Sequence, residues 1–177
     1  MPYSPTIIAN AFLQKAPQEG RALTPLQVLK LVYLAHGWCL GVHRQPLIDE
    51  PVEAWQAGPV IRSLYNAIKQ YGSSAITERL PVRWFSWGRA SKLDVTAAAI
   101  LASVWATYRR YGGVELAVIT RAEGSPWWTT WKGLNGKAMD AERGVIDNAL
   151  IQAFYAQKIK AHNAGEGEHA AITYRPN

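Results

Sequence analysis

The stretch from Leu23 to Leu40, LTPLQVLKLVYLAHGWCL, constrains the fold more than any other part of this sequence. As a helix it is apolar nearly all round, and only Gln27, Lys30 and His36 offer a polar stripe. A helix that is apolar on every side must be enclosed by other elements. The sequence therefore predicts a core hydrophobic helix over 25–42 at the centre of a mainly α domain.

Three Ser-Pro or Thr-Pro pairs mark further helix starts, because the hydroxyl can cap free amides and the proline ring presets the first helical φ. Thr24 also forms a capping box with Gln27. The pairs are Ser4-Pro5, Thr24-Pro25 and Ser125-Pro126. They predict helices over 5–16, 25–42 and 126–132.

Periodic apolar residues predict four more helices. One starts at Ser91, where Asp94 completes a second capping box, and it is stopped by Gly112-Gly113. The other three are an amphipathic helix that opens after Gly58-Pro59 and ends at Gly72, a short helix over 114–120, and a last helix over 148–162.

Short strands are expected in two places. Alternating residues within 46–57 predict a strand pair, and 80–87 is a second candidate. We therefore expect a single helical domain over 1–162 with a small β-hairpin element. The glycines and sparse apolar residues of 163–177 are typical of a flexible C-terminal tail.

The charge and cysteine content narrow the class of protein. The 177 residues contain 19 Lys and Arg against 13 acids, a net charge of +6, which favours an acidic partner or nucleic acid. The single cysteine, Cys39, excludes an intrachain disulfide and fits a reducing compartment. No apolar run reaches the roughly 18 residues of a spanning helix, and the first 15 residues lack signal-peptide features. We expect a cytoplasmic protein without membrane contact.

Few residues suggest a metal site or a nucleophile. His36 and His43 could share a helix face, but no acid or cysteine stands beside them at metal-ligand spacing. Cys39 lies one turn after His36 in an apolar helix, where a thiol is usually inert. His162 and His169 lie near the C-terminal end of the sequence.

Acidic residues give an equally weak catalytic signal. Asp49, Glu50 and Glu53 form a close cluster, and paired carboxylates can perform acid–base work, but a solvated loop explains them as well. The sequence carries no phosphate-binding, dinucleotide-binding, zinc-protease or nucleophile-elbow motif. We therefore predict no enzyme, no cofactor and no metal.

The segment 79–92 is basic and aromatic and contains no acid. Its members are Arg79, Arg83, Trp84, Phe85, Trp87, Arg89 and Lys92. Cations for phosphates and rings for bases are what single-strand binding needs. A protein-binding surface is also rich in Trp and Arg, and a hairpin with packed aromatics and solvated arginines is the structural alternative.

Two blocks of the chain resemble the Panacea domain family of SocA-like antitoxins and GepA-like phage-associated proteins. The first block comprises LKLVYLAHGW at 29–38 and PLIDEPVEAWQAGPVIRSLYNAIKQYG at 46–72, with the Glu-Ala-Trp, Gly-Pro-Val, Leu-Tyr and Tyr-Gly motifs. The second is Gly-Ser-Pro-Trp at 124–127, shortly after Thr120. Arg121 stands where the family usually has a histidine. The resemblance spans roughly 5–160.

The resemblance implies a mostly helical protein that binds a protein rather than a substrate. Members neutralise toxins encoded beside them in bacterial chromosomes, prophages or phages, and SocA-like members can hand the toxin to a protease. It thus implies an antitoxin with a cognate toxin as partner and a protease or chaperone as a further one. The alternatives are a nucleic-acid-binding phage or prophage regulator that uses the basic segment and, more weakly, a hydrolase with an unrecognised site.

The motif residues divide into a scaffold and a set of contacts. The scaffold residues are expected to anchor a tight turn at Gly58-Pro59 against the core helix. They are Trp55, Gly58, Pro59, Tyr65, Pro126 and Trp127. The predicted partner-binding residues are Arg83, Trp84, Trp87, Arg89, Trp128 and Trp131. On a helix from Pro126, Trp127 and Trp131 share a face and Trp128 is rotated away.

Overall fold

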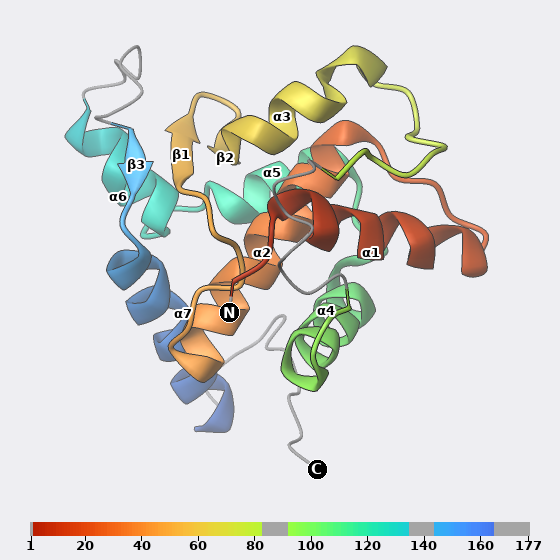
Figure 1. The fold of residues 1–177 in the computed structure, drawn as a ribbon. Coiled ribbons are helices and arrows are strands. Elements are labelled where there is room, and N and C mark those ends of the chain that lie inside the picture. Colours follow the sequence, from red (N-terminus) through yellow and green to blue (C-terminus); the bar gives the residue numbers. More distant parts are fainter. Residues whose placement is uncertain (1, 83–91, 135–143, 165–177) are drawn as a thin grey trace.

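The computed structural model describes residues 2–82, 92–134 and 144–164, and all structural statements concern these ranges. They form seven α-helices and a three-stranded antiparallel sheet (Figure 1). The helices are α1 (Pro5–Gln18), α2 (Pro25–His43), α3 (Arg62–Ile68) with the 3₁₀ turn η1 (Lys69–Tyr71), α4 (Val95–Tyr108), α5 (Gly113–Thr120), α6 (Pro126–Gly133) and α7 (Asn148–Asn163). The strands are β1 (Val52–Trp55), β2 (Gly58–Val60) and β3 (Val145–Ile146). The predicted class, mainly α with a small β element, is confirmed.

Helix α2 is the core of the molecule. Figure 1 shows it running through the middle, with α1 and α4 on one side and α6 and α7 on the other. It packs directly against α1, α4, α5 and α7, and every residue from Val28 to Leu40 is buried. The prediction of a central apolar helix is therefore confirmed.

The predicted polar stripe on α2 is wrong at two of its three positions. Lys30 and His36 are fully buried, and only Gln27 is partly exposed. His36 Nε2 donates to Asn148 Oδ1 over 2.9 Å, and its Nδ1 accepts the Ile48 amide at 3.4 Å. Burial lowers the pKa of His36, so the ring is neutral in the core. Buried polar groups are tolerated when they are hydrogen-bonded in this way.

The three Ser-Pro or Thr-Pro pairs predicted the helix starts correctly, because α1, α2 and α6 begin at Pro5, Pro25 and Pro126, but the hydroxyl forms a cap in only two of them. The box between Thr24 and Gln27 is present at the start of α2, and the Ser125 hydroxyl accepts the Trp128 amide at the start of α6. Ser4 makes no side-chain cap on α1.

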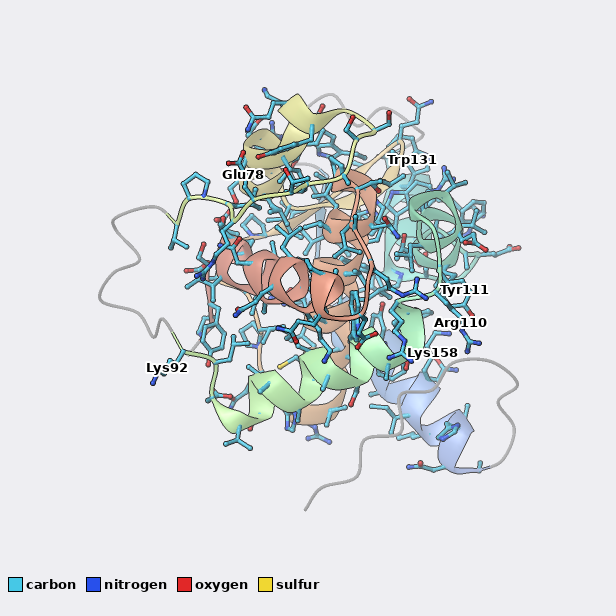
Figure 2. The ribbon with its side chains drawn as sticks, turned by 90° about the vertical axis from the view of Figure 1, so that its right-hand side faces the viewer. Glu78, Lys92, Arg110, Tyr111, Trp131 and Lys158 are labelled. Atoms are coloured by element: carbon cyan, nitrogen blue, oxygen red, sulfur yellow. The ribbon has the colours of Figure 1, made fainter. Side chains whose placement is uncertain are left out.

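The predicted start of the fourth helix at Ser91 is also corrected. Ser91 lies outside the described residues, and α4 begins at Val95 with Asp94 as its N-cap, bonded to the Ala97 amide at 2.7 Å. Figure 2 shows α4 with Lys92 beside this end and with Arg110 and Tyr111 beyond the other.

The sheet differs from its prediction in its bounds and in its third strand, because only β1 lies within 46–57, β2 follows at 58–60, and β3 at 145–146 was not predicted. Strand β1 pairs with β2 from Glu53 opposite Val60 to Trp55 opposite Gly58, and β3 joins the other edge of β1. Gly58 and Pro59 therefore lie in β2, and the expected tight turn there is wrong: the chain reverses at 56–57. Gly58 has a φ of +109°, a conformation that side chains with a Cβ rarely adopt.

The second strand candidate was 80–87, and its described part, 80–82, forms no strand. The backbone of Leu80 bonds instead to the side-chain amide of Asn10, whose Oδ1 accepts the Leu80 amide and whose Nδ2 donates to the Leu80 carbonyl. Residues 83–87 lie outside the described ranges. The predicted C-terminal tail over 163–177 also lies outside the described ranges, except for Asn163 at the end of α7 and Ala164. The boundary between domain and tail therefore stays a prediction.

Close packing of α7 on α2 depends on two glycines. A Cβ placed on Gly37 would overlap the Tyr155 ring, and one on Gly41 would lie 2.6 Å from Tyr155 Cβ. Tyr155 also meets Trp38 edge to face, with ring centroids 5.0 Å apart. Because glycine carries no side chain at these two positions, Tyr155 of α7 can pack directly against the backbone of α2.

Gly37→Ala should therefore destabilise the fold by about 1–3 kcal/mol, because the added methyl displaces Tyr155. The measurement is equilibrium unfolding in urea. Gly133→Ala is the matched control, since it is also helical but has open space around it and should be neutral or stabilising by up to about 1 kcal/mol. Equal stability of the two variants would show that the α2–α7 contact is not tight.

Candidate functional site

The hairpin of β1 and β2 holds a buried acid. Glu53 is only 6% exposed, and its carboxylate accepts Arg62 Nε at 2.8 Å and Arg62 Nη2 at 2.7 Å. Trp55 Nε1 adds a third bond at 2.7 Å. The interpretation of Glu53 as a solvated loop acid is therefore wrong. The bidentate arginine pair and the indole bond engage this carboxylate in contacts that fasten the hairpin to α3.

Aromatic contacts fasten the hairpin to α3 and α6. The Trp55 and Tyr65 rings meet edge to face, with centroids 5.0 Å apart. Trp127, which is buried together with Pro126, donates from Nε1 to the Trp55 carbonyl at 2.7 Å. The structure thus brings five of the predicted scaffold residues together at one hairpin, and the sixth, Pro126, precedes Trp127 at the start of α6.

Beneath β2 lies a lysine that belongs to the core helix. Lys30 Nζ donates to the Pro59 carbonyl at 2.9 Å. A Cβ on Gly58 would lie 2.8 Å from this nitrogen and 3.2 Å from Cγ of Arg121, so the Lys30 ammonium and the aliphatic stem of Arg121 both approach the bare face of the glycine. Burial, together with the charge of Arg121, lowers the pKa of Lys30 to about 7.

Arg121 follows α5 and closes this cluster from outside. Its Nε donates to the Ala117 carbonyl and its Nη1 to the Gln56 carbonyl, both at 3.3 Å, while the guanidinium lies 5.9 Å from the Trp127 ring centre. None of the ion pairs in the described ranges involves Lys30 or Arg121. Sequence reasoning missed Lys30 as a site residue, although a lysine in an otherwise apolar helix was the available signal.

Three tryptophans gather on α6. The Trp127 and Trp131 rings stack with centroids 5.4 Å apart, and the Trp128 ring lies 6.5 Å from Trp127 and 5.4 Å from Lys132 Nζ. Trp128 and Trp131 are half-buried, so each keeps an accessible part. The other predicted partner-binding residues, Arg83, Trp84, Trp87 and Arg89, lie outside the described residues.

Helix α5 exposes an apolar stripe that sequence reasoning missed. Val114 is 71% exposed and Val118 is 58% exposed, and the next side chain, Ile119, is 37% exposed. Val114, Val118 and Arg121 follow each other at spacings of four and three, so the stripe leads toward Arg121. Clustered apolar side chains at a surface are typical of a protein interface.

Two further titratable side chains, Cys39 and Asp94, line a pocket near the N-terminal end of α4. Cys39 lines a pocket with Tyr3 and Asp94, but burial raises the pKa of its thiol to about 11, so it is protonated at neutral pH. Asp94 caps α4 and accepts the Tyr3 hydroxyl at 2.9 Å. The described part of the chain holds no group of three or more side chains suited to a metal, and none of its helices is long and apolar enough to cross a membrane.

Comparison with known proteins places this arrangement in a family. The model for "Antitoxin SocA-like, Panacea domain" matches residues 28–128, a range that contains Lys30, the hairpin, α5 and Trp128. The chain belongs to this family. Antitoxin SocA of Caulobacter vibrioides (strain NA1000 / CB15N) is 26% identical over 156 residues, which cover 86% of this chain and 82% of the relative. No solved structure matches the chain. The resemblance seen in the sequence motifs is confirmed.

Replacing Lys30 should change how stability depends on pH. The folded pKa is about 7 and the usual value is 10.5, so between these pH values the unfolded chain binds more protons and stability rises with pH. From pH 7 to pH 9 the wild type should gain about 2 kcal/mol of unfolding free energy through this group, and Lys30→Met should lack that gain. Urea unfolding at pH 7, 8 and 9 measures it. Exposed Lys69→Met is the control, and parallel profiles for wild type and Lys30→Met would refute the burial of a titrating ammonium.

Proposed function

We propose that this protein is an antitoxin that neutralises a cognate protein toxin by direct binding. The observation that carries the proposal is the match of residues 28–128 to the SocA-like Panacea family, supported by a relative named as an antitoxin over most of both chains. We further propose that the protein acts in the cytoplasm without catalysis, that its gene belongs to a phage or prophage, and that a protease or chaperone can join the complex.

The surface of α5 and α6 supports a protein partner. Val114 and Val118 are exposed on one helix, and Trp128 and Trp131 are half-exposed on the next. Trp is among the residue types that dominate binding energy at interfaces, and apolar neighbours exclude water around it. Both helices are fixed to the core, so little conformational freedom is lost on binding.

Nucleic-acid binding has weaker support. Its main residues, Arg83 to Arg89, lie outside the described ranges, and several described cations are already neutralised, as in the pairs of Arg62 with Glu53 and of Arg109 with Glu19. If this alternative held, replacing Arg83 and Arg89 by Ala would lower the salt slope of single-strand binding by about 1.4. Under the antitoxin proposal, Trp84→Ala or Trp87→Ala instead loosens a protein complex by about 2 kcal/mol or more.

Co-expression tests the proposed function directly. The product of the gene next to this one should arrest growth when expressed alone, and this protein should restore growth and co-purify with it. A harmless neighbour together with no co-purified partner would refute the antitoxin proposal.

A charge placed on the α5 stripe should disrupt the complex. Val118→Glu introduces a carboxylate that must be desolvated at the interface, so the affinity for the toxin should fall at least about tenfold and growth rescue should weaken. Isothermal titration with the purified toxin measures the change. Val95→Glu is the matched control, because Val95 is an 87% exposed valine on α4. Equal affinities of the two variants would exclude the α5 stripe as the interface.

A further inference from the structure

Lys30 and Arg121 both contact the hairpin, and neither takes part in an ion pair within the described ranges. We propose that Arg121 and Lys30 together bind a carboxylate group of the protein partner, which approaches Arg121 from the surface beside the 56–57 turn. The identity of the partner as a protein rests on the proposed function, whereas the binding of a carboxylate rests on the geometry of this cluster.

The hydrogen-bond donors of the cluster are only partly used. Lys30 has three N–H groups and the structure gives it one acceptor, the Pro59 carbonyl. Arg121 has five, and two of them reach carbonyl oxygens at 3.3 Å, near the long end of the hydrogen-bond range. A carboxylate can replace these weak neutral acceptors with shorter, charge-assisted bonds.

The acid of the hairpin itself is already engaged by other side chains. Glu53, on the same hairpin, is held by two bonds from Arg62 and one from Trp55. Around Lys30, the charged side chain that acts on it is Arg121, and the two repel each other. A buried charge without an opposite partner is costly, as the lowered pKa of Lys30 reflects, and an anion that arrives with a partner would offset this cost.

The shape of the hairpin keeps room for both cations. Gly58 presents no side chain to them, and any Cβ there would contact Lys30 Nζ and crowd Arg121. The neighbouring residues Gln56 and Ala57 are exposed, and Arg121 is half-buried, so the guanidinium is reachable from solvent while Lys30 strengthens the positive field behind it.

The site lies next to the proposed interface. Arg121 follows Val118 by three residues at the end of the exposed α5 stripe, and its guanidinium lies over Trp127 of the α6 cluster. A partner seated on the apolar stripe would thus bring an Asp, a Glu or its C-terminal carboxylate within reach of Arg121.

The first experiment uses the free protein, with acetate as the probe. Lys30 is titrated by NMR of labelled lysine, with the signal assigned through Lys30→Met, in sodium acetate and in sodium chloride of equal ionic strength. Acetate should raise the pKa of Lys30 in the wild type, because a bound anion stabilises the ammonium. The same rise is expected in Arg110→Gln, which alters an exposed arginine beyond the end of α4.

Arg121→Gln should abolish this response to acetate. The variant also removes a repulsive charge and so raises the starting pKa of Lys30, which is why acetate and chloride are compared within each variant. The carboxylate site would be refuted, whatever the partner proves to be, if acetate left the pKa of Lys30 unchanged in wild-type protein or raised it equally in Arg121→Gln.

The second experiment uses the complex. Arg121→Gln should weaken toxin binding at least about tenfold, whereas Arg110→Gln should leave it unchanged. Suppose that wild-type protein responds to acetate, but that Arg121→Gln and wild type bind the toxin with equal affinity. This result would overturn the partner as the source of the carboxylate and indicate a free small anion. If wild-type protein binds no toxin at all, both the proposed function and the partner as the source of the carboxylate are refuted. The acetate titration then decides by itself whether Arg121 and Lys30 bind a carboxylate.

Discussion

Enclosure of α2 is the constraint on which the structure depends. A helix whose side chains are buried on every face from Val28 to Leu40 requires neighbours all round, and α1, α4, α5 and α7 supply them. The glycines at 37 and 41 let α7 approach through Tyr155, and the hairpin covers the remaining part near Lys30. Each of these elements contacts the same central helix.

The polar groups of that helix connect it to distant segments. His36 bonds to Asn148 at the start of α7, and Lys30 bonds to the Pro59 carbonyl of β2. Such bonds have value because the alternative is an unsatisfied polar group in the core. Lys30 differs from His36 in keeping a charge near neutral pH with Arg121 beside it, and this difference makes the hairpin cluster a functional candidate as well as a structural one.

Several parts of the fold and site were predictable because their causes are local. The Thr24 capping box marked the start of α2, and the Ser-Pro pair at 125–126 marked the start of α6. The motif residues around Trp55 and Trp127 do meet at one hairpin. The start of α4 was placed too early, since Asp94 serves as the cap itself and not as the third residue of a box. No strand forms over 80–82, the described part of the second candidate, where the side chain of Asn10, 70 residues away from Leu80, satisfies the Leu80 backbone.

The sequence by itself determined the helical class, the central position of α2 and the family, because periodicity, capping and ordered motifs are all written in neighbouring residues. Only the tertiary structure decided which polar side chains are buried and with whom. Glu53 was interpreted as a loop acid, but Arg62 holds it, and Lys30 was assigned to a polar stripe of α2, but β2 covers it. The exposed valines of α5 follow the same rule, since the side that a helix leaves uncovered depends on what packs against the other. Burial and pairing are properties of the assembled chain, and no single segment contains them.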